Sequence, residues 1–273
     1  MKHKLNFLFI IVILLMTLAA CGTNTVPPVT SAPTENSAMV EYSDADSTES
    51  FLGETEEAEN DRLVEFQYAL QQIAFEHIYP DGTDTGFDST YGSIEDNQFA
   101  IYDVNGDGVD ELIVRFTTAP MAGNTEKIYE FHKADGTVKP ILIASPNLTY
   151  YSDGTIKEDW SHGSGLAGED YWPYTLYRYN VAEESFEEIA QVNMWSKAVD
   201  TVDFKGDTYP DDIDAEGAGT VFILTHQGIV ETISKTEYEK WLSDTVNVSA
   251  EIDIPYQALS EENIKAIVES GNM

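Results

Sequence analysis

The sequence predicts an α+β protein, mainly β: an antiparallel β meander of short hairpins with one N-terminal helix and two short C-terminal helices. Three observations predict this fold class. Apolar residues recur at helical spacing over 63–77, apolar runs with a period of two follow over 99–232, and helix-capping patterns come last, at Ser234 and Ser260. Strands do not alternate with helical patterns between 99 and 232, as the crossovers of a parallel sheet would require.

The first helix is expected to begin at Asp61 and to end before Pro80. Its apolar face consists of residues three or four apart, namely Leu63, Phe66, Leu70, Ile73 and His77. On this face, His77 is expected to be a packed or hydrogen-bonded core residue and not a metal ligand.

Strands are expected where apolar residues alternate along the chain. The alternation is clearest at Phe99 and Ile101 and at Leu112, Val114 and Phe116. Further strand-like runs lie at 127–133, 137–143, 148–152, 174–180, 185–192, 220–225 and 228–232. Asp135-Gly136 and Asp153-Gly154 separate such runs and favour tight hairpins, because both central residues of these turns can take positive φ. Short hairpins predict antiparallel neighbours.

Two short helices are expected at the C-terminal end. Ser234 and Glu237 have the spacing of a capping box, and Ser260 is a second N-cap. Apolar pairs flank both caps at the spacing of a hydrophobic staple: Ile233 with Tyr238, and Leu259 with Ile264. Together with the preceding strands, these helices predict a single globular domain over 61–273.

Composition restricts the partners. The 273 residues include 14 Lys and Arg against 49 Asp and Glu, for a formal net charge of −35, and 42% are hydrophobic. The apolar content is enough for a core and excludes wholesale disorder. The charge repels phosphate backbones, which excludes a nucleic-acid partner. Cys21 is the only cysteine, so an intrachain disulfide and a cysteine-based metal cluster are both excluded.

The N-terminus has the pattern of a signal peptide. Lys2 and Lys4 precede an apolar run at 7–20, which is too short to span a bilayer comfortably. The run ends in Leu-Ala-Ala-Cys-Gly at 18–22, which closely resembles a bacterial lipobox. This resemblance implies removal of residues 1–20 and attachment of lipid to Cys21. The expected location is extracytoplasmic, on the outer face of the bacterial cytoplasmic membrane, with the lipid as the only membrane contact.

Residues 21–60 are expected to form the lipidated cysteine and a disordered acidic spacer. Positions 22–60 contain nine acidic residues and no Lys or Arg, with many Ser, Thr and Pro. Such a segment repels itself and has too few large apolar groups to offset its ordering entropy. An acidic recognition tail is the alternative interpretation.

One motif is specific for a metal. The segment 103–111 places oxygen-bearing side chains at positions 1, 3, 5 and 9 and a glycine at position 6. Calcium prefers six to eight hard oxygen ligands. We therefore expect one structural Ca²⁺ held by side chains and one backbone carbonyl, with water completing the shell: Asp103, Asn105, Asp107 and Glu111, and the carbonyl of Val109. The alternative is an Asp/Gly-rich turn without an ion, in which the crowded carboxylates would repel one another.

The loop resembles the calcium turns of FG-GAP and VCBS-type β repeats more than an EF-hand. Val114 stands where an EF-hand has its position-12 glutamate, and strand-like sequence flanks the loop. With the lipobox, this loop makes the chain similar to a group of surface lipoproteins of Gram-positive bacteria, a resemblance that implies no activity. A second, weaker copy lies at 212–217, with Asp212, Asp214 and Glu216 at positions 1, 3 and 5 but Thr220 at position 9.

No catalytic motif stands out. His132, His162 and His226 are isolated, and the Trp-Ser-His-Gly-Ser-Gly segment at 160–165 lacks a nucleophile elbow. Acidic pairs such as 158–159 and 169–170 suit a glycosidase but are expected by chance among 49 acids. No Walker or dinucleotide motif appears, and no organic cofactor is expected.

An aromatic run at 171–179, with Trp160 and Trp195 near it in sequence, offers ring faces that can stack on a sugar or peptide or build a core. Two function classes follow. The first is a non-catalytic, calcium-stabilised surface module that binds a glycan, a peptide or an envelope component. The alternative is an extracytoplasmic hydrolase of glycans or peptides whose site the sequence does not reveal.

Overall fold

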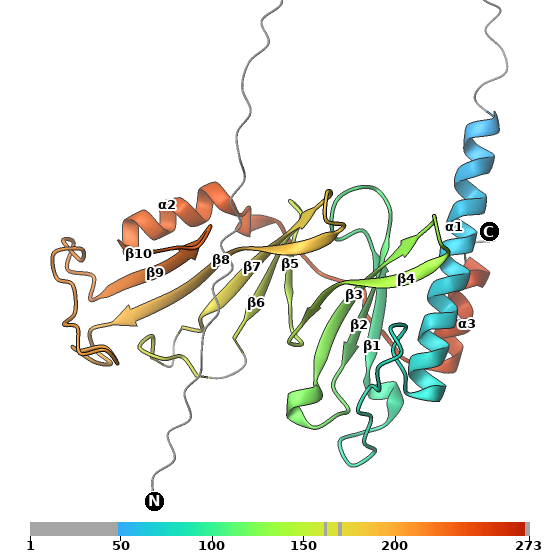
Figure 1. Cartoon of the computed structure of the whole chain (residues 1–273), viewed down its shortest axis with the longest axis horizontal. Coiled ribbons are helices and arrows are strands. Elements are labelled where there is room, and N and C mark those ends of the chain that lie inside the picture. Colours follow the sequence, from blue (N-terminus) through green and yellow to red (C-terminus); the bar gives the residue numbers. More distant parts are fainter. Residues whose placement is uncertain (1–48, 161–162, 169–170, 271–273) are drawn as a thin grey trace, which may run out of the picture. The chain divides into compact units, whose positions relative to one another are not determined.

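The computed structural model describes residues 49–160, 163–168 and 171–270, which belong to a compact unit spanning 46–273. Within these residues there are three α-helices and two antiparallel sheets, of five and seven strands (Figure 1). The predicted fold class, mainly β with one helix before the strands and two after them, is confirmed. The meander is divided between two sheets, which the sequence did not predict.

The helices are α1 (Glu49–Gln71), α2 (Lys235–Thr245) and α3 (Glu261–Ser270). The strands of the five-stranded sheet are β1 (Gln98–Tyr102), β2 (Glu111–Phe116), β3 (Thr125–His132), β4 (Thr137–Ala144) and β12 (Gln257–Ala258). Those of the seven-stranded sheet are β5 (Thr149–Tyr151), β6 (Thr155–Asp159), β7 (Tyr174–Asn180), β8 (Ser185–Ser196), β9 (Thr220–His226), β10 (Ile229–Ser234) and β11 (Glu251–Ile252).

Consecutive strands are neighbours in both sheets, except for the last two. The strand orders are β12-β1-β2-β3-β4 and β10-β9-β8-β7-β6-β5-β11. After α2, the chain pairs Ile252 with Tyr150 at one edge of the seven-stranded sheet and then Gln257 with Phe99 at an edge of the five-stranded sheet. The C-terminal segment therefore adds a strand to each sheet.

Both predicted Asp-Gly hairpins are present. Asp135-Gly136 lies between β3 and β4, and Asp153-Gly154 lies between β5 and β6. Only the glycine of each pair takes a positive φ, 65° at Gly136 and 74° at Gly154. Glycine suits these positions because a side chain is rarely accommodated in the left-handed region.

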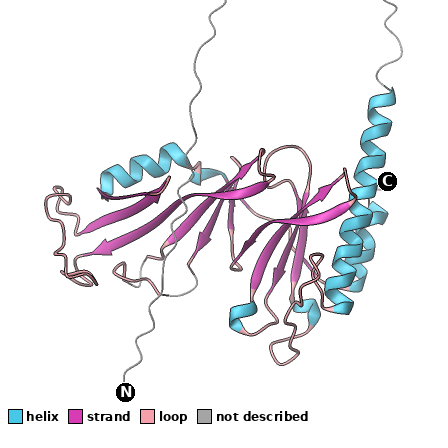
Figure 2. Cartoon of the chain, in the orientation of Figure 1, coloured by secondary structure: helices cyan, strands magenta, loops and turns pink. Residues whose placement is uncertain are grey.

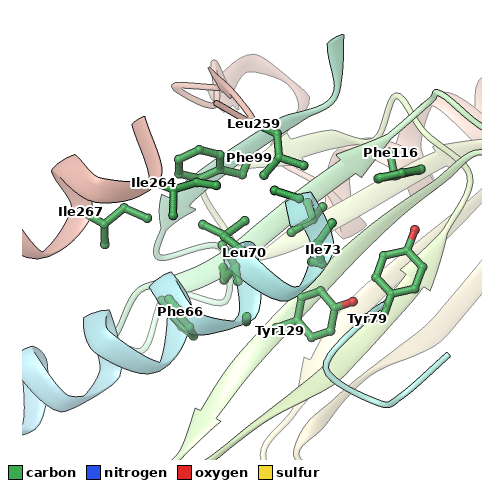
Figure 3. Packing of buried hydrophobic residues seen from close by; sticks show 14 of the residues in the cluster. Phe66, Leu70, Ile73, Tyr79, Phe99, Phe116, Tyr129, Leu259, Ile264 and Ile267 are labelled. Atoms are coloured by element: carbon green, nitrogen blue, oxygen red, sulfur yellow. The ribbon is translucent and has the colours of Figure 1, made fainter. Parts of the chain in front are cut away.

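The five-stranded sheet packs one face on α1 and α3, as the helical and strand periodicities predict. Phe66 and Leu70 of α1, and Ile73 of the π-helical turn that continues it (Gln72–Glu76), meet Phe99 and other alternate residues of β1 to β3 (Figure 3). Residues of α3, including Ile264, close the same cluster (Figure 3). His77 follows the helix and stacks on Phe87 with ring centroids 4.6 Å apart, so its predicted packing role is confirmed.

The helix α1 begins at Glu49, twelve residues before the predicted start at Asp61. The segment 54–60 is rich in Glu, a good helix former, and contains no proline, so it can continue a helix already formed by the packed turns. The part of the predicted spacer at 49–60 is therefore helical. Cys21, the signal peptide at 1–20 and the rest of the spacer lie outside the described residues.

A second cluster joins the two sheets. Ile113 and Ile128 on the other face of the five-stranded sheet pack with Tyr150, Ile156 and Phe186 of the seven-stranded sheet. A third cluster of buried side chains joins the opposite face of the seven-stranded sheet to α2. Figure 2 shows this helix lying along one side of the sheet. The two sheets therefore share an apolar core, with the helices on their outer faces.

Both predicted helix caps are present at the C-terminal end. The Glu237 carboxylate accepts a hydrogen bond from the Ser234 backbone N–H at 2.9 Å, while the Ser234 hydroxyl accepts one from the Glu237 N–H. The Ser260 hydroxyl accepts one from the Asn263 N–H at 3.3 Å. These contacts satisfy N–H groups that a helix terminus leaves free. None of the helices in the described ranges is long and apolar enough to cross a membrane.

Candidate functional site

The predicted calcium loop connects β1 to β2, and its aspartate side chains accept hydrogen bonds from backbone N–H groups of the same loop. Asp103 accepts hydrogen bonds from the N–H groups of Gly106 at 2.7 Å and Gly108 at 2.9 Å. Asp107 accepts one from Val109 at 2.7 Å. Gly106 and Gly108 have φ values of 83° and 87°, a conformation that favours glycine. The sequence therefore folds locally into a tight loop with its carboxylates turned inward.

Glu111 is the first residue of β2 and is only 1% exposed. Its carboxylate accepts hydrogen bonds from the Val104 N–H at 2.9 Å and from the Asn105 side-chain amide at 2.8 Å. Burial raises the pKa of the Glu111 carboxyl to about 8, and the charges of Asp107 and Asp103 act in the same direction, against the hydrogen bond from Val104. The loop thus concentrates negative charge around a buried carboxylate.

The side chains of this loop are not all oriented to bind a cation. Asn105 presents its amide nitrogen to Glu111, while its oxygen accepts a hydrogen bond from the Asp107 N–H at 2.9 Å. Among the described residues, no group of three or more His, Cys, Asp and Glu side chains is arranged to hold a metal. A calcium ion would require the Asn105 amide to rotate and the carboxylates to converge on a common centre, which they can do while still accepting backbone hydrogen bonds.

The charges of the loop are not neutralised by side chains within the described residues. No Lys, Arg or His there forms a salt bridge with Asp103, Asp107 or Glu111. Arg62 of α1 instead lies 3.7 Å from Asp110, one position out of the predicted ligand register. The donor set is composed of hard oxygens with surplus negative charge, which suits a divalent cation.

The loop also touches the other sheet. A Cβ built on Gly154, in the β5–β6 hairpin, would lie 2.9 Å from the carbonyl oxygen of Asn105. Tyr179 of β7 donates a hydrogen bond to Glu130 of β3 at 2.7 Å, and both Asp107 and Glu130 raise the pKa of the Tyr179 hydroxyl in addition to its burial. The loop is therefore part of a contact between the two sheets.

A second candidate site is an aromatic pocket on the seven-stranded sheet, with a volume of about 340 Å³. It lies between β5, β6 and β7, the segment before β7, and α2 with the residues that follow it. The pocket is lined by Tyr151, Lys157, Asp159, Tyr171, Trp172, Tyr174, Leu176, Tyr238, Leu242, Val246 and Val248.

The rings of this pocket are held in place by one another. The hydroxyl groups of Tyr174 and Tyr238 lie 2.9 Å apart, in hydrogen-bond contact, and Tyr238 stacks on Phe222 with centroids 3.7 Å apart. Burial raises the pKa of Tyr171 and Tyr174 far above the usual value, so both hydroxyls are neutral at physiological pH. Trp172, by contrast, is 47% exposed. The pocket therefore combines a wall of packed aromatic rings with an accessible indole.

A charged pair lies at the same pocket. Lys157 and Asp159 project from β6, and the Lys157 Nζ is 2.7 Å from the Asp159 Oδ1. The same ammonium lies 5.0 Å from the centroid of the Tyr174 ring, within the range of a cation–π contact. The pocket thus presents hydrogen-bond donors and acceptors beside its aromatic faces.

The aromatic run at 171–179 serves both roles considered in the sequence analysis. Tyr177 and Tyr179 pack towards the other sheet, whereas Tyr171, Trp172 and Tyr174 line the pocket. Tyr171 and Trp172 precede β7, and the register of β7 shifts between Leu176 and Tyr177, so simple alternation along the sequence does not separate the two sets. What the sequence could not indicate is Tyr238, which α2 brings to the pocket from a distant position. Trp195 lies elsewhere, in a small cluster with Tyr209.

The weaker acidic segment at 212–217 has a different arrangement. Asp214 accepts hydrogen bonds from the Ala218 and Gly219 N–H groups at 2.8 Å each and from the Tyr209 hydroxyl at 3.0 Å. Glu216 instead accepts one from Thr236 at 2.7 Å. The carboxylate of Asp214 therefore organises its own loop.

The remaining candidates do not assemble into a site. His132 and His226 lie 3.6 Å and 3.5 Å from single glutamates, Glu184 and Glu231. Of the acidic pairs, Glu158 accepts hydrogen bonds from backbone and tyrosine groups, while Asp159 lines the pocket. His162 and the pair at 169–170 lie outside the described residues.

No protein-family model matches the chain, and neither does any curated protein or solved structure.

Proposed function

We propose that this protein is a lipid-anchored, extracytoplasmic binding module that carries one structural Ca²⁺. The anchor is the expected lipid on Cys21, and the expected location is the outer face of the bacterial cytoplasmic membrane. The observation that carries the binding role is the aromatic pocket, where an exposed Trp172 stands beside fixed tyrosine rings and a Lys157–Asp159 pair. Concave sites with apolar walls and few polar groups are typical of ligand binding.

The calcium proposal rests on the loop at 103–111. Four oxygen-bearing side chains lie in one turn at calcium-loop spacing, Glu111 is buried, and the nearby charges of Asp103 and Asp107 are negative. A divalent cation would compensate the repulsion among these carboxylates. Its role is structural, because every proposed ligand closes the turn.

The anchor is tested by metabolic palmitate labelling of the wild-type chain and of Cys21→Ala in a bacterial host. We expect label and membrane fractionation with the wild type and loss of both with Cys21→Ala, because Cys21 is the only cysteine in the sequence. Equal labelling of the two proteins would contradict the anchor.

The binding role is tested by co-sedimentation of the full chain, in mild detergent, with purified cell-envelope material. We expect saturable binding that Trp172→Ala weakens and that Phe204→Ala, an exposed aromatic substitution outside the pocket, leaves unchanged. Assays for released sugars or peptides run in parallel. Turnover would favour the alternative, an extracytoplasmic hydrolase, and an absence of binding would contradict the proposed function.

A further inference from the structure

We infer that the ligand of the aromatic pocket is a neutral saccharide, with its ring stacked on Trp172 and its hydroxyl groups bound by Lys157 and Asp159. This inference rests on the proposed binding function and specifies the chemical class of the ligand. It is drawn from the walls of the pocket, from the charged pair beside them and from the pairing of the strands beneath.

The walls suit a ring with an apolar C–H face. Tyr171, Trp172, Tyr174 and Tyr238 line the pocket, and Trp172 leaves nearly half of its surface accessible. The faces of aromatic rings carry partial negative charge and attract the weakly positive C–H groups of a pyranose, while contact removes apolar surface from water. A volume of about 340 Å³ lies in the range of small-molecule sites, roughly 300–1,000 Å³.

The charged pair suits neighbouring hydroxyl groups. The Lys157 ammonium donates hydrogen bonds and the Asp159 carboxylate accepts them, and the two groups are 2.7 Å apart on one strand. A vicinal diol has both a donor and an acceptor at each hydroxyl, so it can bind both side chains at once. Because the pair is formally neutral, it favours a ligand without net charge.

Charged ligands are disfavoured by the same residues. A cation would compete with the Lys157 ammonium, which already lies over the Tyr174 ring at 5.0 Å. An anion would approach the Asp159 carboxylate and a chain of net charge −35. Neutral polyhydroxylated rings avoid both penalties.

An extended peptide is disfavoured by the sheet. Peptides that add to a sheet need a strand edge with free backbone N–H and C=O groups. The strands under the pocket are β5, β6 and β7, and each has a neighbouring strand on both sides, in the order β11-β5-β6-β7-β8, with β5 pairing to β6 at Ile156 and Lys157. The pocket therefore offers side chains and ring faces for recognition, in place of a free strand edge.

The experiment is a titration of the full chain, in mild detergent, with an array of neutral oligosaccharides followed by calorimetry on those that bind. Soluble probes include cellobiose, maltose and N,N′-diacetylchitobiose, with fully deacetylated chitobiose as the matched cation and digalacturonate as the anion. We expect at least one neutral saccharide to bind saturably and more tightly than the charged probes. Trp172→Ala should weaken that binding roughly tenfold or more, as for a central aromatic contact.

Two further variants test the polar contacts. Lys157→Met keeps the apolar stem but removes the donor, and Asp159→Asn removes the charge, so each should weaken saccharide binding while Phe204→Ala leaves it unchanged. Circular dichroism confirms that each variant is folded.

The outcomes separate the two proposals. Saturable envelope binding that depends on Trp172, with no neutral saccharide bound or able to compete, would overturn the saccharide inference and leave the binding function. Preference for a charged probe, or saccharide binding that Trp172→Ala does not weaken, would also overturn the inference. An absence of binding to both envelope material and saccharides would contradict both.

Discussion

Glu126 and Glu111 are buried glutamates on neighbouring strands of the same sheet, and their environments differ in charge. Glu126, in β3, is 0% exposed and accepts a hydrogen bond from the Arg115 guanidinium at 2.8 Å. It also accepts hydrogen bonds from the hydroxyls of Tyr150 and Tyr256 and from the Asn147 N–H. Glu111, in β2, has hydrogen bonds only from neutral donors among the described residues, and Asp103 and Asp107 add negative charge beside it.

Both carboxylates lie where the two sheets meet. The donors to Glu126 come from β2 of its own sheet, from β5 and the turn before it, and from the C-terminal segment that links the sheets. Glu111 belongs to the loop that contacts Gly154 of the β5–β6 hairpin. A buried carboxylate is costly unless it is paired and hydrogen-bonded. In the contact around Glu126, the Arg115 guanidinium supplies the positive charge. The contact around Glu111 has no such side chain among the described residues, and its composition suits a cation bound from solution.

The largest effect is expected from breaking the contact around Glu126. Glu126→Ala would leave the largely buried Arg115 guanidinium and the buried Tyr150 hydroxyl without their acceptor. Loss of one partner of a buried pair typically costs about 3–5 kcal/mol of the free energy of unfolding. Denaturant unfolding measures this loss. Glu130→Ala is the matched control on the same strand, since its hydrogen bond with Tyr179 is part-buried, and it should cost less. Equal losses of stability in the two variants would contradict a special contribution from the buried pair of Glu126 and Arg115.

Features that depend on local contacts were predictable from the sequence, whereas features that depend on long-range contacts were not. Capping at Ser234, the Asp-Gly hairpins and the alternation of the strands depend on residues a few positions apart, and these were predicted correctly. The pairing of β11 and β12 and the approach of Tyr256 to Glu126 join residues one hundred or more positions apart. Such pairing leaves no periodic signal in short strands of two residues.

The two candidate sites also differ in whether their residues are close together in the sequence. The loop at 103–111 is a continuous segment, so its residue spacing was visible in the sequence, although the Asn105 orientation was not. The pocket combines β6, β7 and α2, so only its aromatic run was visible. Lys157 has no distinguishing signal in the sequence, because a lysine on a strand is common at a sheet surface.

A smaller effect is expected at the contact between the loop and the β5–β6 hairpin. Gly154→Ala would place a Cβ 2.9 Å from the Asn105 carbonyl oxygen, at a φ of 74°. Strain of this kind costs of order 1–3 kcal/mol of the free energy of unfolding. Gly136→Ala is the matched control, because its φ is 65° and nothing lies within 4 Å of the added Cβ. Thermal unfolding should show the larger loss for Gly154→Ala, and equal losses would contradict the close contact.

The smallest effect, and the one that decides the comparison, is expected from calcium. Extracellular calcium modules bind with dissociation constants on the order of 10⁻⁴–10⁻³ M. Binding to the folded state alone would then add about 0.4–1.4 kcal/mol to the free energy of unfolding at roughly millimolar calcium. Thermal melts of the full chain with calcium and with chelator measure this difference. The contact around Glu126 should not respond to the ion, so Glu126→Ala should retain the calcium-dependent increase wherever it still folds cooperatively.

Two neighbouring aspartates provide the control for the ion. Asp107→Ala removes a central proposed ligand and should abolish the calcium-dependent rise in melting temperature. Asp110→Ala removes the carboxylate that lies 3.7 Å from Arg62, so it should lower the melting temperature with and without calcium and keep the rise. Because both variants lose one negative charge from the same turn, a non-specific effect of calcium on an acidic protein would change them equally. That result, or a wild-type midpoint indifferent to calcium, would show that the loop at 103–111 is an acidic turn closed by its own backbone hydrogen bonds.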